Sequence, residues 1–264
     1  MILILRIMIV LLISLMVTAC STGKLSILPE NIKGSNSILV IPYKASPVRI
    51  DVYNPRFGGI AGLVQSSIHR RATNTDRDKM ADYLNEIRGD WDPTLATAEE
   101  CLTMLRGETG IDIINSSMDN THEIPGAELL RNKSSRLFTA NENYWNSGWD
   151  KVLDDFKNST NSFQIYKKEH PSIKEDWILE VVNFNSTMTN EHIEFMLYMK
   201  LTNSSSGKIL ASGNCWNSSL IPSEKGYDYD IWKKGFDFII WEKGFREVSK
   251  DACAYTLNKM GLKK

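Results

Sequence analysis

The sequence lacks the short patterns that mark the common catalytic and nucleotide-binding sites. None of its four histidines forms the H-E-x-x-H pair that places two zinc ligands on one helix face. No G-x-S-x-G turn is present to expose a nucleophilic serine, and the glycine-rich run at 57–63 matches neither phosphate-binding fingerprint. We therefore expect no metal and no cofactor, and the sequence favours a protein that is not an enzyme. A hydrolase whose active site is assembled from distant residues is the alternative.

An excess of charge is also missing. Lysine and arginine together number 31 against 32 aspartates and glutamates, and the formal net charge is −1. A nucleic-acid-binding domain normally carries a basic surface that neutralises phosphates, so no nucleic acid partner is expected. After residue 20, no apolar run approaches the roughly 20 residues that span a bilayer.

Cysteine is scarce, with four residues at positions 20, 101, 215 and 253. None of them forms the close C-x2-C pair of a zinc site. The three that follow Cys20 allow one disulfide and leave one thiol over. Cys215 falls on an expected strand and Cys253 on the last expected helix, so a Cys215–Cys253 bridge is a possible disulfide, and a fully reduced protein is the alternative.

The first twenty residues have the character of an export signal. Arg6 is followed by an almost unbroken apolar run at 7–17, which is too short for a membrane span and typical of a signal peptide. The run ends in Val17-Thr18-Ala19-Cys20, which resembles the lipobox of bacterial lipoproteins. The resemblance implies cleavage before Cys20 and lipidation of its thiol, with palmitate among the acyl chains. Ser21 resembles the sorting signal for the outer membrane, and the cell envelope is the expected location.

The rest of the chain predicts one αβ domain. We expect a signal peptide at 1–19, a lipidated cysteine with a flexible tether at 20–36, and a globular body at 37–264. Branched or alternating apolar residues predict strands, and residues at helical spacing predict helices. The expected strands are 37–43, 48–53, 111–115, 177–184, 192–202 and 208–216, and the expected helices are 60–71, 76–87, 97–106 and 241–260.

These elements indicate an α/β or α+β fold. It has a single mixed sheet of about five strands, a C-terminal antiparallel meander and helices packed on the sheet. The strand at 192–202 alternates cleanly, which predicts one buried face. A capping box is expected at Thr97–Glu100, and Gly261 is expected to end the last helix. Residues 118–172 predict an ordered but irregular segment, with a short helix at 150–157 and an extended piece at 162–166.

One repeated pattern brings aromatic residues together near the C-terminus. Ile231-Trp-Lys-Lys-Gly-Phe236 recurs nine residues later as Ile240-Trp-Glu-Lys-Gly-Phe245. The pattern predicts either rings that cap the sheet beside the last helix, which we favour, or an exposed aromatic ledge that binds a partner. The ledge would consist of Trp232, Phe236, Trp241 and Phe245.

The outline of the body resembles several Gram-negative envelope lipoproteins. It shares an apolar strand after the tether, glycine-led helices and a late hairpin with the turn Ser206-Gly207-Lys208. A similar outline is found in the curli-secretion lipoprotein, in lipoprotein activators of cell-wall synthases and in the amino-terminal domain of the Tol-system periplasmic protein. The resemblance implies a binding or scaffold protein with an envelope protein or peptidoglycan as partner. An oligomeric secretion or assembly subunit is a further alternative.

Overall fold

The computed structural model describes residues 37–46, 48–50, 76, 78–84, 86–89, 91–108, 113–117, 120–133, 138–139, 142–188, 192–220, 233 and 237–262. The predicted signal peptide, the tether and the predicted helix at 60–71 lie outside the described residues. Within the described residues, no helix combines the length and the apolar character needed to cross a bilayer.

A mixed sheet of seven strands forms the centre of the described structure. The strands are β1 (Ser37–Tyr43), β2 (Val48–Ile50), β3 (Ile113–Ser116), β4 (Phe138–Thr139), β5 (Trp177–Met188), β6 (His192–Asn203) and β7 (Ile209–Leu220). One edge of β5 pairs in parallel with β1 and then β2, while the other edge pairs antiparallel with β6. The mixed sheet and its C-terminal antiparallel meander confirm the prediction. The strand number exceeds about five, and only the two-residue β4 has no counterpart among the expected strands.

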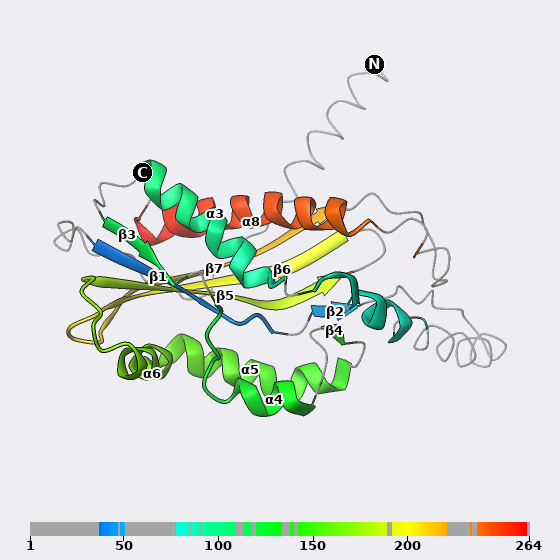
Figure 1. Cartoon of the computed structure of the whole chain (residues 1–264), viewed down its shortest axis with the longest axis horizontal. Helices are drawn as coiled ribbons and strands as arrows, with labels where there is room; N and C mark the ends of the chain where they lie inside the picture. The colour runs from blue at the N-terminus through cyan, green and yellow to red at the C-terminus, as the bar shows by residue number, and fades with distance from the viewer. Residues whose placement is uncertain are drawn as a thin grey trace, which may run out of the picture.

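Helices cover both faces of this sheet, which gives three layers (Figure 1). One face carries α3 (Pro93–Glu108) and α8 (Phe238–Met260). The opposite face carries α4 (Ala127–Lys133), α5 (Glu142–Asn158) and α6 (Asn161–Glu169). Two separate groups of buried apolar side chains fill the spaces between the sheet and its two helical layers.

The second helical layer changes how the strands are buried. On β6, the predicted alternation is present, and Phe195, Leu197, Met199 and Leu201 pack toward α3 and α8. The prediction of a single buried face is nevertheless wrong, because Tyr198, Lys200 and Thr202 are buried as well. A sheet covered on both sides buries both sets of alternating side chains.

The expectation of an irregular segment at 118–172 is wrong, because this region contains all of α4, α5 and α6. The short helix expected at 150–157 is the second half of α5. The extended piece expected at 162–166 is part of α6. Phe163 and Tyr166 are three residues apart and both are buried. Residues at this spacing share one face of a helix, so helical packing explains their pattern.

The helix ends show where local sequence signals apply. Asp92 precedes α3 and its carboxylate accepts a hydrogen bond from the Thr94 N–H at 2.7 Å. The capping box expected at Thr97 is therefore wrong, since Thr97 lies inside the helix and its hydroxyl donates to the Pro93 carbonyl. Gly261 ends α8 with φ 79°, which confirms the predicted C-cap.

Candidate functional site

The predicted cysteine pairing is wrong for Cys253, which forms a disulfide with Cys101 and not with Cys215. The bond joins α3 to α8, with the two Cα atoms 5.3 Å apart. Cys253 faces the neighbouring helix, where its sulfur lies 3.4 Å from the Thr97 carbonyl oxygen. Cys215 is buried on β7. The predicted lipidation site, Cys20, lies outside the described residues.

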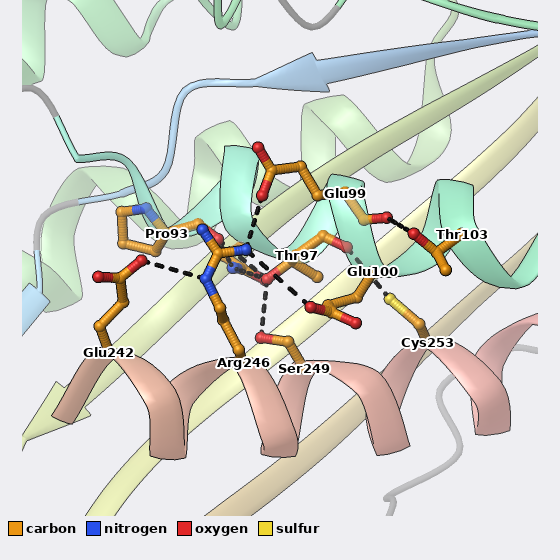
Figure 2. Close-up of polar contacts among 10 residues, drawn as sticks. Pro93, Thr97, Glu99, Glu100, Thr103, Glu242, Arg246, Ser249 and Cys253 are labelled. Carbon is orange, nitrogen blue, oxygen red and sulfur yellow. Dashed lines mark hydrogen bonds and ion pairs between the residues drawn. The ribbon is translucent and has the colours of Figure 1, made fainter. Parts of the chain in front are cut away.

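Polar contacts join the same two helices on the N-terminal side of the disulfide (Figure 2). The Thr97 and Ser249 hydroxyls share a buried hydrogen bond of 3.0 Å. The Arg246 guanidinium, on α8, lies 2.6 Å from Glu99 on α3 and 3.1 Å from Glu242 on its own helix. Exposed ion pairs of this kind contribute little to stability, so the disulfide and the buried contacts hold this layer together.

Asn183 on β5 connects the same layer to the sheet. Its side-chain amide donates to the Pro93 carbonyl at 2.8 Å and to the Thr97 hydroxyl at 2.6 Å. Its backbone N–H donates to the Thr94 hydroxyl at 3.0 Å. Because these donors and acceptors are buried and bonded to one another, they fix the start of α3 on the sheet.

The aromatic ledge predicted near the C-terminus is wrong for the two members that the structure describes. Trp241 is 1% exposed and Phe245 is 0% exposed. Both pack against Trp91, with ring centroids 4.9 Å and 5.4 Å from it. The favoured prediction, rings that cap the sheet beside the last helix, fits these positions. The other two members, Trp232 and Phe236, lie outside the described residues.

The opposite face of the sheet contains a buried ion pair. Glu180 on β5 and Lys200 on β6 stand directly opposite each other in the strand register. Their charged groups are 3.2 Å apart, and both side chains are 0% exposed. The ammonium also donates to the carbonyls of Phe156 and Ser159, at 2.8 Å and 2.9 Å. It therefore also satisfies two carbonyl oxygens at the end of α5.

A hydroxyl completes this ion-pair cluster. Ser162, on α6, donates a 2.5 Å hydrogen bond to Glu180 and lies 3.3 Å from the Lys200 nitrogen. Burial raises the pKa of Glu180, although Lys200 opposes this shift. Burial lowers the pKa of Lys200, and Glu180 opposes that shift in turn. The ammonium donates to oxygens around it, so it is held as a charged structural partner and not as a base for Ser162.

A pocket of about 300 Å³ opens next to this cluster, between α6 and the chain that leads into α4. Tyr43 and Ser162 contribute to its wall, as do His122, Tyr166 and three glutamates, Glu123, Glu128 and Glu169. The backbone fixes His122 at the sheet edge. Its N–H donates to the Pro42 carbonyl at 3.0 Å, and its carbonyl accepts from the Lys44 N–H at 2.8 Å.

Aromatic rings surround His122 in this pocket. Its ring centroid lies 6.3 Å from Tyr43, 4.7 Å from Tyr166 and 5.8 Å from His170. Burial lowers the pKa of His122, and His170 adds to the shift while Glu169 opposes it. Burial also raises the pKa values of Tyr43 and Tyr166. At neutral pH, the pocket thus presents a neutral imidazole and two neutral phenols beside carboxylates.

No sequence pattern marks these pocket residues as members of a site. His122 stands alone in the sequence, and Tyr43 is the last residue of a predicted buried strand. Glu180 had a usable signal, because it is a charged residue within the apolar run 177–184 and a buried charge requires a partner. Among the residues that the structure describes, no group of three or more potential ligands is placed to hold a metal ion.

Comparisons with known proteins give a weak likeness. No family model and no curated protein match the chain. Several solved structures align with it, and three of them are described below. A PelC dodecamer from Paraburkholderia phytofirmans is 9% identical, with a TM-score of 0.36, over 90% of this chain and 94% of that one. Lipoprotein GNA1162 from Neisseria meningitidis is 13% identical, with a TM-score of 0.25, over 72% of this chain and 87% of that one. The LpoB C-terminal domain from Salmonella enterica is 9% identical, with a TM-score of 0.23, over 70% of this chain and 87% of that one. At these TM-scores, the likeness supports no inference about function.

Proposed function

We propose that this protein is a lipid-anchored accessory protein of the bacterial cell envelope, and that its αβ body binds a partner. The lipobox-like Val17-Thr18-Ala19-Cys20 carries the proposal. The disulfide between Cys101 and Cys253 supports it independently, because structural disulfides persist in oxidising compartments such as the periplasm and are rare in the cytosol.

The geometry favours binding over catalysis. The Ser162 hydroxyl donates to Glu180, but that carboxylate is held in the buried ion pair with Lys200, and Lys200 is itself a donor. A serine nucleophile requires a base that is free to accept its proton. The pocket beside this cluster opens to solvent and carries carboxylates and aromatic rings. These groups are suited to recognition.

The anchor can be tested by replacing Cys20 with serine. We expect the wild-type protein in the membrane fraction, with incorporation of a labelled fatty acid. The Cys20→Ser variant should appear in the soluble envelope fraction without label, because a serine does not provide the thiol that accepts the diacylglycerol. Ser21→Ala is the matched control, since it changes the adjacent residue and retains the thiol. Retention of the unlabelled variant in the membrane would contradict the anchor.

The same strains test the accessory role. Crosslinking in intact cells, followed by capture of this protein, should recover a specific envelope protein or peptidoglycan. The yield should fall with Cys20→Ser, because loss of the anchor removes the body from the membrane surface. If the anchored protein recovers neither class of component, the binding role has no support. Separation of inner and outer membranes in these strains tests the outer-membrane location, which Ser21 suggests.

A further inference from the structure

Two polar atoms in the pocket beside α6 lack a hydrogen-bond partner within the described structure. They are the Tyr43 hydroxyl and Nε2 of His122, and both atoms are buried. Tyr43 is 1% exposed, and Ser162 and Glu180 lie near its hydroxyl, but no hydrogen bond of acceptable geometry joins them. A buried polar group without a partner is costly, so such groups mark places where a ligand can supply the missing bond.

The charge of the lining selects the kind of ligand. Glu123, Glu128 and Glu169 all line the pocket, and no lysine or arginine is among the lining residues that the structure describes. The low pKa of His122 keeps its imidazole neutral at pH 7, so the ring does not offset these carboxylates. An anion entering the pocket would meet like charge, whereas a cation would be attracted.

The rings in the same pocket favour an organic cation. Tyr43 and Tyr166 contribute to its wall beside His122. Tyr166 and His170 pack with ring centroids 4.4 Å apart and an interplanar angle of 31°. The face of an aromatic ring attracts a positive charge, and this attraction adds to that of neighbouring carboxylates. A phenolic oxygen and a neutral imidazole nitrogen can each accept an N–H bond.

We propose that this pocket binds a primary ammonium group, either of a small free amine or of a lysine side chain on a partner protein. In the bound state, the ammonium lies among the pocket rings and donates to Tyr43 and His122, and the glutamates balance its charge. The proposal deepens the binding role proposed above by stating what the pocket recognises. It does not depend on the lipid anchor.

Titration of the purified full chain in detergent tests this proposal, with binding followed through the NMR signals of the His122 ring. n-Butylamine represents a free amine, and Nα-acetyl-lysine amide represents a lysine side chain. The neutral counterparts are n-butanol and the same lysine derivative acetylated on Nε. We expect at least one amine to shift the His122 signals and its neutral counterpart to bind at least tenfold more weakly. Added salt should weaken the binding as it screens the carboxylates.

Three variants locate the binding site. Glu128→Gln combined with Glu169→Gln should weaken amine binding by about fivefold, the scale expected for two exposed charges. Glu247→Gln combined with Asp251→Asn removes two exposed charges on α8, on the opposite face of the sheet, and should leave binding unchanged. Tyr43→Phe retains the ring but removes the unpartnered hydroxyl. It should weaken binding severalfold without lowering stability, which a thermal melt checks.

The outcomes separate clearly. Selective binding of the lysine derivative supports the proposal and favours a lysine side chain as the ligand, whereas selective binding of butylamine supports it and favours a small free amine. Equal binding of the neutral counterparts, binding of neither amine, or equal weakening by the α8 variant would overturn it. If the protein fractionates with membranes but binds no amine, the pocket proposal fails while the proposed anchor stands.

Discussion

Replacing Lys200 with methionine would leave the buried Glu180 carboxylate without its ion-pair partner. Methionine has a similar length and fills the same space without a charge. The change removes the 3.2 Å ion pair and the two hydrogen bonds from Lys200 to the carbonyls of Phe156 and Ser159. It also removes the contact between the ammonium and the Phe156 ring, at 4.2 Å from the ring centroid.

We expect the Lys200→Met variant to lose about 4 kcal/mol of unfolding free energy. Breaking a buried ion pair on one side costs about 3–5 kcal/mol, because the remaining charge stays buried. Since domains are stable by about 5–15 kcal/mol, the loss takes a large part of the total. Urea denaturation followed by circular dichroism measures it. Lys208→Met, an exposed change on the hairpin, is the control and should stay within about 0.5 kcal/mol of wild type.

Removing both charges should lower the free energy of unfolding less than removing Lys200 alone. In the variant that combines Lys200→Met with Glu180→Met, no charge is left buried, so most of the lost stability should return. If the double variant instead loses the sum of the two single losses, the two charges do not act as a pair. A loss below about 1 kcal/mol for Lys200→Met would equally refute the reasoning.

The pH dependence has a definite sign. Burial already raises the pKa of Glu180 in the folded protein, and Lys200 opposes this shift. Without Lys200, the pKa of Glu180 in the folded state rises further above its unfolded value. A raised carboxyl pKa contributes stability below the unfolded pKa, and this contribution is lost as the pH rises through the folded pKa. The stability that Lys200→Met loses relative to wild type should therefore be largest at neutral pH and should become smaller as the pH falls toward 4.5.

Two further predictions concern the α3–α8 layer. Replacing both Cys101 and Cys253 with alanine opens a loop of 152 residues. In the loop-entropy model, this change lowers the free energy of unfolding by about 5 kcal/mol, which is the upper end of the usual range for a disulfide. Mass spectrometry of a non-reduced digest should recover peptides linked through these two residues, and a Cys215–Cys253 link would refute the assignment. Asp237→Ala removes the side chain that caps α8 by accepting from two backbone N–H groups at 2.8 Å and 3.3 Å. It should cost about 1 kcal/mol in thermal or urea unfolding, whereas Asp251→Ala on the exposed middle of α8 should cost less.

The strands and the last helix could be predicted from sequence because their signals are local. The apolar runs at 37–43 and 177–184 coincide with β1 and the first part of β5. Gly261 ends α8 because a left-handed residue is needed there. The second helical layer could not be predicted from the sequence. Its helices α5 and α6 bury isolated aromatic residues such as Phe163 against the sheet, and the polar residues around them leave no clear helical spacing of apolar side chains.

The pocket and the disulfide depend on tertiary contacts between residues far apart in the chain. Cys101 and Cys253 are 152 residues apart, and only the packing of α3 on α8 brings them together. His122 reaches Tyr43 through a single bridge at the end of β1. Neither position carries a local pattern. Glu180 and Lys200 come from predicted strands, but their pairing required the β5–β6 register.

The disulfide also gives the backbone a closed topology. The chain from Cys101 to Cys253 forms a covalent ring that includes five of the strands and all of α4, α5 and α6. A protease that cuts one peptide bond inside this ring opens it but releases no fragment, because the disulfide still joins the two halves. The pocket residues from His122 to Glu169 lie within the ring. A nicked molecule would therefore migrate as one species until a reductant separated its pieces.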